Sequence, residues 1–244
     1  MSSRAAAAPP LLEARVGPAR VWCTGRPHGN VADHVGDAPE NVARNRAALA
    51  ARPEIAAPEG WVWVSQVHGA VVFSATTTAL EAAAASGRAP VADAAETRRR
   101  GLALAIVTAD CAPLVVASGE SVAVVHAGHP GLAHGVIEAA IARVREAGGG
   151  DVRAFLGPCI RAPRYEFGRD DLDRFVAQFG PTVEGRTRAG RPALDIPAAI
   201  RVVLDREGVV DFEDCGICTA DSPGYFSYRR DGQTGRQATI AVLA

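Results

Sequence analysis

The stretch Leu102-Ala-Leu-Ala-Ile-Val-Thr-Ala-Asp-Cys-Ala-Pro-Leu-Val-Val-Ala117 decides how this chain folds. Its two apolar runs, 102–107 and 113–117, are short and are separated by a small turn segment. Short continuous apolar runs of this kind predict strands that are buried on both faces. The turn presents Asp110 and Cys111, and loops at strand ends are where a rigid scaffold exposes reactive side chains.

Further elements surround this pair of strands. Strands are predicted at 61–68, 71–73, 121–125, 152–156, 225–230 and 238–243. Helices are predicted at 37–51 with Asp37 as N-cap and Pro39 in the first turn, at 131–147, at 170–179, and at 195–208 with Asp195 as N-cap. Residues 75–95 fit either a helix or a loop, and 180–193 predicts a polar loop.

The order of these elements indicates the fold class. Strands and helices do not alternate strictly, so the pattern favours an α+β fold with a mixed β-sheet flanked by helices. No internal repeat or long linker divides the chain. We therefore expect residues 1–244 to form one domain, with residues 1–12 as a flexible tail.

Composition excludes several classes of protein. The chain has 244 residues, 48% hydrophobic and 22% charged, which are ordinary globular values. A net charge of −1 gives no reason to expect nucleic acid or a membrane surface as partner. The sequence shows no secretory signal and no stretch long enough to span a bilayer. Five scattered cysteines do not make a disulfide framework, so we expect a reducing, cytoplasmic location.

Three residues are candidates for chemistry: His68 in Ser-Gln-Val-His-Gly, Cys111, and His126 in Val-Val-His-Ala-Gly. Each stands where an apolar, strand-like run stops. Two imidazoles and a thiolate form a ligand set that suits zinc, with a fourth position open to water in a catalytic site. The same three residues also fit a cysteine nucleophile with a histidine base. A structural cysteine in the core is a third interpretation.

Other motifs are less specific. Cys215-Gly-Ile-Cys218 lacks the second ligand pair of a structural zinc site. Gly128-His129-Pro130-Gly131 opens the predicted helix at 131–147, where free N–H groups favour an anion. The arginines within 227–236 are either solvated or suited to binding phosphate.

Together these segments resemble the YfiH family, also called the laccase-domain or multicopper polyphenol oxidase family and described as purine nucleoside phosphorylases. The matching segments follow one another along the chain: Asn30-Val-Ala-Asp-His-Val-Gly-Asp37 with Asn45-Arg46, Gln66-Val-His-Gly69, Ala92-Asp-Ala94, Thr108-Ala-Asp-Cys-Ala-Pro113, His126-Ala-Gly128, Gly157-Pro158 with Tyr165-Glu166, Cys218-Thr219, and Phe226-Ser-Tyr-Arg-Arg-Asp-Gly-Gln-Thr-Gly-Arg236.

The resemblance implies that His68, Cys111 and His126 bind Zn2+, with Cu2+ as the alternative ion. It implies phosphorolysis of adenosine, inosine and methylthioadenosine, deamination of adenosine, and, for some bacterial members, a link to peptidoglycan editing. It also implies a fold grouped with predicted cysteine hydrolases. The chain departs from the family pattern at His129-Pro130, where Trp-Arg is common, and at 157–166, where two cysteines are absent. Arg161 and Arg164 could replace the lost charge.

The leading hypothesis is therefore a zinc-dependent purine nucleoside phosphorylase acting on a nucleoside and phosphate. The expected catalytic residues are Cys111, Asp110 and His126, and the expected substrate-binding residues are Asn30, Gln66, Arg230 and Arg236. We expect Arg230 or Arg236 to reach the metal pocket. The usual zinc-deaminase signature is missing, so deamination would need another arrangement.

Two alternatives remain. One is a metal-free Cys-His hydrolase acting on cell-wall precursors, and another is a nucleoside-binding homologue whose catalysis has weakened. A true multicopper laccase is disfavoured because six histidines are too few for its copper centres. The only methionine, Met1, is also a poor candidate for an axial copper ligand.

Overall fold

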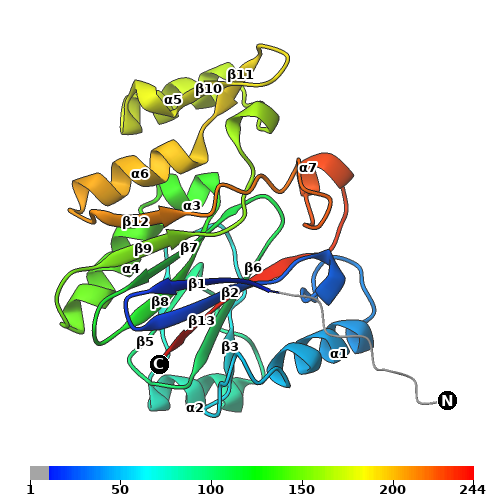
Figure 1. Ribbon diagram of the computed structural model, residues 1–244, viewed down its shortest axis with the longest axis vertical. Coiled ribbons are helices and arrows are strands. Elements are labelled where there is room, and N and C mark those ends of the chain that lie inside the picture. Colours follow the sequence, from blue (N-terminus) through cyan, green and yellow to red (C-terminus); the bar gives the residue numbers. More distant parts are fainter. Residues whose placement is uncertain (1–10) are drawn as a thin grey trace.

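The computed structural model describes residues 11–244, and its strands form two larger sheets and a small hairpin (Figure 1). The five-stranded sheet has the order β1 (Leu12–Val16), β2 (Ala19–Cys23), β13 (Gln237–Leu243), β6 (Ala103–Thr108), β3 (Trp61–Trp63). The six-stranded sheet has the order β12 (Asp211–Asp214), β9 (Arg153–Leu156), β7 (Ala112–Ala117), β8 (Val122–Ala127), β5 (Ala94–Thr97), β4 (Val72–Ser74). Each sheet mixes parallel and antiparallel pairs, which confirms the α+β fold with mixed sheets, although two large sheets replace the single one expected.

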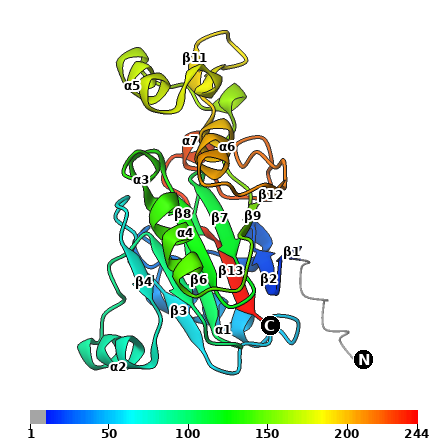
Figure 2. The ribbon, with the colours of Figure 1, turned by 90° about the vertical axis from the view of Figure 1, so that its left-hand side faces the viewer.

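Helices cover the outer faces of the two sheets, which pack against each other (Figure 2). One core lies between the sheets. A second lies between the six-stranded sheet and the helices α4 (Val136–Glu146) and α6 (Ile196–Arg206), and it continues to α5 (Arg169–Phe179), which packs on α6. A third lies on the outer face of the five-stranded sheet, where α1 (Pro39–Ala50) contributes Leu49. The layers therefore run helix, sheet, sheet, helix.

The stretch 102–117 joins these layers. In β6, Leu104 and Ile106 point between the sheets, whereas the alternate residues pack toward α1. In β7, Val115 points between the sheets and Leu114 points toward α4. Because side chains alternate along a strand, a continuous apolar run serves two cores at once. Both predicted strands are confirmed, and the turn between them carries the chain from one sheet to the other.

Several predicted helix boundaries need correction. Ala38, not Asp37, is the N-cap of α1. Asp37 lies one residue before the cap, and its carboxylate accepts hydrogen bonds from the Ala38 N–H and the Asn41 side-chain amide. The predicted helix 131–147 is two helices, α3 (His129–Ala133) and α4, because Gly135 adopts φ 84° and ends the first. The cap of α6 is confirmed, since the Asp195 carboxylate accepts the Ala198 N–H.

Other segments also differ from expectation. The strand predicted at 61–68 ends at Trp63, and 75–95 contains both α2 (Thr77–Ser86) and the start of β5. The predicted loop 180–193 forms the hairpin β10 (Glu184–Arg186) and β11 (Pro192–Leu194). The strand predicted at 225–230 is wrong, because Ser227 caps the short helix α7 (Tyr228–Asp231). The strands β1, β2 and β12 were not predicted.

The flexible tail predicted at residues 1–12 overlaps the first strand. Residues 1–10 lie outside the described residues, and Leu12 already belongs to β1. The described residues also contain three short 3-10 helices: Arg26–His28, Ala162–Arg164 and Pro181–Val183.

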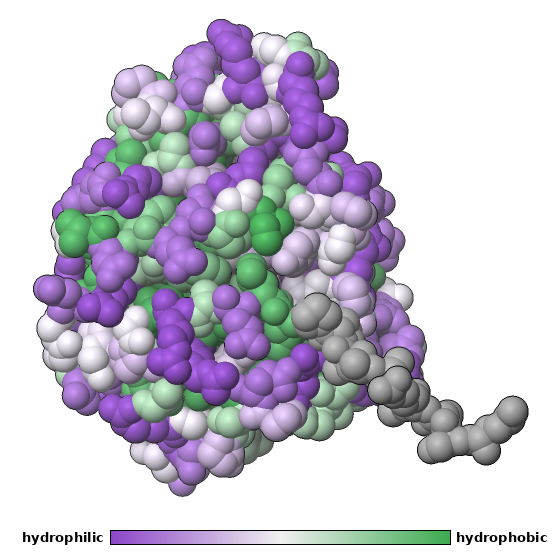
Figure 3. All heavy atoms as spheres, viewed as in Figure 1, coloured by the Kyte–Doolittle hydropathy of each residue, from purple (hydrophilic) through white to green (hydrophobic). Residues whose placement is uncertain are grey.

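The surface is mixed in character. On the face seen in Figure 3, hydrophilic side chains are spread widely and hydrophobic ones form smaller patches between them. Within residues 11–244, no helix combines the length and the apolar character that crossing a membrane requires.

Candidate metal centre and its cavity

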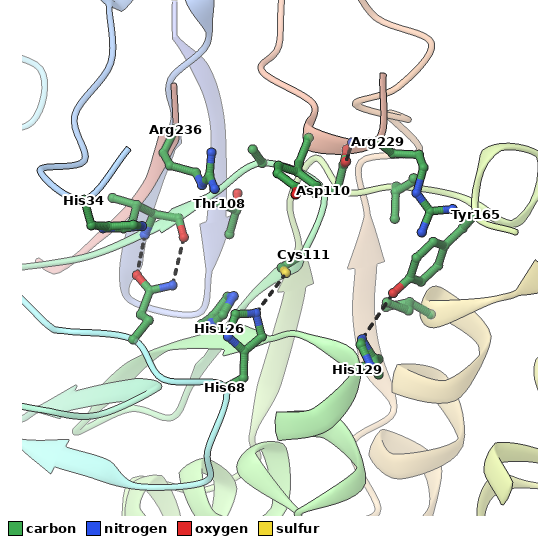
Figure 4. Close-up of a pocket in the computed structure, with 16 residues that line it drawn as sticks. His34, His68, Thr108, Asp110, Cys111, His126, His129, Tyr165, Arg229 and Arg236 are labelled. Atoms are coloured by element: carbon green, nitrogen blue, oxygen red, sulfur yellow. Dashed lines mark hydrogen bonds between the residues drawn. The ribbon is translucent and has the colours of Figure 1, made fainter. Parts of the chain in front are cut away.

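His68, Cys111 and His126 come together at the junction of the two sheets (Figure 4). Their ligand atoms all lie within 4.8 Å of one another, and Cys111 Sγ is 3.7 Å from His68 Nε2. His68 lies in the loop after β3, Cys111 in the turn before β7, and His126 in β8. Among residues 11–244, no other group of three His, Cys, Asp or Glu side chains is gathered in this way.

Asp93 holds two of these residues in place. Its carboxylate is fully buried and accepts the N–H groups of Val67, His68 and Gly69 at 3.2, 2.8 and 2.7 Å. The same carboxylate lies 2.9 Å from Nδ1 of His126. Carboxylates that bind a ligand histidine in this way fix its tautomer and ring orientation. The sequence alone indicates no role for Asp93, although it stands in the Ala92-Asp-Ala94 segment.

The backbone at the site is strained. His68 has φ 61° and Asp110 has φ 96°, values that cost non-glycine residues about 1–3 kcal/mol. The Asp93 hydrogen bonds hold the His68 loop. Asp110 is held by its own side chain, whose Oδ1 accepts from Thr219 Oγ1 and whose Oδ2 accepts from the Arg229 N–H, both at 2.6 Å. Strain that the surroundings hold in place in this way is common at functional sites.

Gly128 makes room for His68 and Cys111. A Cβ at this position would lie 2.6 Å from Cδ2 of His68 and 3.4 Å from Sγ of Cys111. The first distance is shorter than real Cβ contacts allow. Only glycine therefore lets the segment between β8 and α3 pass close enough for His68 to face Cys111.

We call His68, Cys111 and His126 the triad. The charges of these three side chains depend on one another. Burial opposes ionisation of the Cys111 thiol, but the charge and hydrogen bonds of His126 and His68 outweigh it and lower its pKa to about 6. Burial opposes charging of His126, but the Cys111 thiolate and Asp93 raise its pKa to about 9. Burial likewise raises the pKa of Asp93, yet hydrogen bonds from His126, Gly69 and Val67 lower it overall.

These donors fit a zinc ion. Zinc takes thiolate and imidazole ligands, and the Asp93 carboxylate supports one imidazole from behind. The same thiolate and imidazolium also form the ion pair of an activated cysteine nucleophile. Both interpretations of the triad therefore remain physically consistent.

The triad opens into a cavity of about 380 Å³. In Figure 4, two groups of side chains lie on opposite sides of the Cys111 sulfur. We call His34, Thr108 and Arg236 the cationic arm, and His129, Tyr165 and Arg229 the aromatic arm. The remaining lining residues are Gln66, His68, Val107, Ala109, Asp110, Cys111, His126, Ile160, Ile196 and Tyr228.

The cationic arm has free hydrogen-bonding capacity. Thr108 is 2% exposed, and its hydroxyl has no hydrogen-bond partner among the described residues. Leaving a buried hydroxyl unpaired costs roughly 1–3 kcal/mol, so a polar ligand group would relieve this cost. The Arg236 guanidinium uses Nη1 on the carbonyls of Thr234 and Gly235, and burial lowers its pKa. Its Nε and Nη2 have no partner within residues 11–244.

The predicted substrate-binding residues do not all line the cavity. Arg236 lines the cavity, whereas Arg230 does not and donates to the carbonyls of Thr219, Ser222 and Tyr225. Gln66 lines the cavity, but both ends of its amide pair with the Val107 backbone at 2.8 Å. Asn30 lies outside the cavity, and its Oδ1 accepts the Arg236 N–H at 2.9 Å. These hydrogen bonds hold the segments around the cavity, and the role of Asn30, Gln66 and Arg230 in binding substrate stays a prediction.

Two further expectations change. α3 has only five residues, so the predicted anion pocket at 128–131 lacks the dipole of a long helix. Arg161 and Arg164 form ion pairs with Asp214 and Asp221 instead of lining the cavity. All five cysteines, Cys215 and Cys218 included, are unpaired.

Comparison with known proteins identifies the class. Residues 26–244 match the family described as multi-copper polyphenol oxidoreductase laccase, and the chain belongs to this family. Solved structures agree: protein NMB0706 of Neisseria meningitidis has a TM-score of 0.80 at 32% identity, covering 96% of this chain and 98% of that one. The structure of YfiH from Bacillus licheniformis, 23% identical with a TM-score of 0.79, shows the same fold over 93% of both chains.

Curated relatives carry a more specific name. Purine nucleoside phosphorylase SCO2081 of Streptomyces coelicolor is 40% identical over 218 residues, covering 88% of this chain and 87% of the relative. A purine nucleoside phosphorylase of Corynebacterium glutamicum is 36% identical, covering 88% of this chain and 86% of the relative. The resemblance to the YfiH family seen in the sequence is thereby confirmed.

Proposed function

We propose that this protein is a zinc-dependent purine nucleoside phosphorylase that acts on adenosine, inosine and methylthioadenosine. The observation that carries the proposal is the cavity itself, where a His-Cys-His ligand set lies between a cationic arm and an aromatic arm. A phosphorolytic enzyme needs places for an anion and for a flat base on either side of the reacting carbon. Relatives named purine nucleoside phosphorylase support the assignment.

Each part of the site has a proposed role. His68, Cys111 and His126 would hold zinc, which supplies Lewis-acid chemistry when bound. The free nitrogens of Arg236 and the Thr108 hydroxyl donate to phosphate, and a guanidinium suits this task because its donors match phosphate geometry. Asp110, whose two carboxylate oxygens each accept a hydrogen bond, positions the backbone of Arg229 beside the cavity.

A second candidate follows from the Cys111–His126 pair. A thiol with a pKa near 6 beside a buried imidazole is also what a metal-free cysteine hydrolase needs. In that case Cys111 would attack an acyl group of a cell-wall precursor, and His126 would supply the proton to the leaving group. The behaviour of Cys111 toward alkylating reagents and chelators separates the two candidates.

Two other activities bear on the family resemblance, adenosine deamination and a laccase reaction. Adenosine deamination stays a prediction from the family resemblance, and inosine formed from added adenosine would reveal it. A laccase reaction is disfavoured, because residues 11–244 gather only one group able to hold a metal, whereas a multicopper oxidase needs several copper ions.

The setting of the protein is also part of the proposal. We propose that residues 1–244 form one domain, because the same core packs β1 and β13 against strands from the middle of the chain. Unpaired cysteines throughout the chain fit the proposed reducing, cytoplasmic location.

The test combines metal analysis with turnover. Protein purified without added metal should contain close to one zinc per chain and release hypoxanthine from inosine only when phosphate is present. The Cys111→Ala variant should lose both zinc and activity. Base release at the same rate without phosphate would reject phosphorolysis, and full activity after complete zinc removal would reject the metal.

A further inference from the structure

His129 is a cavity histidine that the ligand group does not use. It is the first residue of α3, three positions after His126, and it lines the same cavity. Its ring packs edge-on against Phe167, with ring centres 5.2 Å apart and planes at 81°, and also contacts Phe175. This packing fixes the imidazole plane at the wall of the cavity.

Tyr165 fixes the hydrogen bonding of that imidazole. Its hydroxyl lies 3.3 Å from His129 Nδ1. Burial raises the pKa of Tyr165, so the phenol keeps its proton and can donate a hydrogen bond to Nδ1. Burial lowers the pKa of His129, which favours the neutral ring. A neutral imidazole that accepts at Nδ1 carries its own proton on Nε2.

The Tyr165 ring is itself held from the other side. The Arg229 guanidinium lies 4.8 Å from the ring centre, and its Nη1 donates to the Glu166 carbonyl at 3.0 Å. The Arg229 N–H is bound by Asp110, the neighbour of Cys111. A chain of contacts thus sets the position of His129 relative to the triad, while its Nε2 has no hydrogen-bond partner in the described part of the chain.

We propose that the His129–Tyr165 pair recognises the purine base, with His129 Nε2–H donating a hydrogen bond to N7. This inference rests on the proposed function and adds a specificity-determining residue to it. N7 is an acceptor that adenine and hypoxanthine share, and it lies on the edge of the base away from N3 and the sugar. A single N–H donor therefore serves both 6-amino and 6-oxo purines.

The same hydrogen bond assists departure of the base. In phosphorolysis a phosphate oxygen bonds to C1′ of the ribose, and the C1′–N9 bond breaks with its electron pair remaining on the purine. That charge spreads over the five-membered ring to N7, where the Nε2–H bond stabilises it. The proton lost by hydrogenphosphate returns to the purine through solvent, and His129 keeps its own proton.

The test compares adenosine with 7-deazaadenosine, which carries C–H in place of N7. Binding is measured by calorimetry on the zinc-loaded protein without phosphate. We expect the unsubstituted protein to bind adenosine about tenfold more tightly, a difference of about 1.4 kcal/mol. His129→Phe keeps the ring packing but has no N–H, so it should bind the two nucleosides equally.

Two tyrosine variants complete the test. Tyr165→Phe removes the partner of Nδ1, and we expect the preference for adenosine to fall to roughly threefold. Tyr228→Phe removes another cavity hydroxyl without touching His129, and it should keep the full preference. If His129→Phe does not fold, Tyr165→Phe decides the question.

The outcomes separate the two levels of the proposal. Nucleoside binding that keeps its tenfold preference in His129→Phe, or in Tyr165→Phe when the first variant does not fold, overturns the base-recognition role alone. An unsubstituted protein that binds neither nucleoside overturns the proposed function and this inference together. Zinc content should match that of the unsubstituted protein in all three variants, since none alters a ligand of the triad.

Discussion

The Asp93 carboxylate links His126 to the backbone of His68: Oδ1 lies 2.9 Å from His126 Nδ1 and 2.8 Å from the His68 nitrogen. One buried side chain thus sets the orientation of one imidazole and the loop position of the other. With Nδ1 bound to Asp93, His126 directs Nε2 toward Cys111. The geometry of the triad therefore depends on a residue outside it.

Replacing Asp93 with Asn should weaken zinc binding by about 10- to 100-fold. An amide cannot accept from three backbone N–H groups and His126 at once, and its NH2 would face a donor. Competition with a chromophoric chelator measures the affinity. Glu96→Gln is the matched control, because Glu96 is another buried carboxylate but pairs with Ser121. We expect the control to lower thermal stability and leave zinc affinity unchanged. Equal zinc affinities in the two variants would show that Asp93 does not support the zinc ligands.

Cys111 should react with iodoacetamide only after zinc is removed. In the chelated protein the alkylation rate should rise through about pH 6 and level off above it, because the thiolate of a thiol with pKa about 6 is fully formed at higher pH. An ordinary cysteine, with a pKa of 9.0, keeps accelerating to alkaline pH. Peptide mass spectrometry identifies the modified residue, and buried Cys23, whose pKa burial raises to about 12, is the internal control. Rapid labelling of untreated protein, unaffected by chelator, would favour the cysteine hydrolase.

Arg236→Ala should weaken phosphate binding by about 10- to 100-fold and change nucleoside binding little. The guanidinium offers charge-assisted hydrogen bonds worth about 1.5–3 kcal/mol to an anion in the cavity. The phosphate KM, measured at saturating inosine, reports the effect. Arg230→Ala is the control, since that side chain donates to backbone carbonyls and lies outside the cavity. It should lower the melting temperature and leave the phosphate KM unchanged; the opposite pattern would move the anion site to Arg230.

Gly128→Ala should reduce zinc affinity at least tenfold, because the added Cβ would lie 2.6 Å from Cδ2 of His68 and displace that ring. Gly224→Ala is a suitable control: a Cβ there meets no heavy atom within 4 Å, and its φ lies outside the left-handed range. Zinc content after dialysis against a weak chelator compares the two variants. Equal zinc retention would show that His68 is not needed as a ligand in the position seen here.

Much of this architecture could be predicted from the sequence, and the failures have physical causes. The strands β6 and β7 were predictable because burial on both faces leaves an unbroken apolar run. Asp93 could not be assigned, because its partners stand 24 to 33 positions away and a lone acid between alanines has no periodic signal.

The choice between neighbouring arginines failed for a related reason. Arg229 reaches the cavity and Arg230 points away from it because Ser227 caps a short helix where a strand was predicted. In a single turn of helix, the local phase decides which side chain faces the site, and composition does not encode that phase. Likewise, only the fold shows that the Thr108 hydroxyl is buried and has no partner among residues 11–244.

The position of β13 has a consequence for how the protein is made. This strand lies between β2 and β6, with Thr239 opposite both Cys23 and Ile106. As translation proceeds, β2 and β6 emerge from the ribosome long before residues 237–243, and each waits with an unpaired edge. Arg229 and Arg236 belong to the segment that leads directly into β13. A nascent chain therefore has to keep two open edges from aggregating until the strand that closes the sheet also brings the cavity arginines into place.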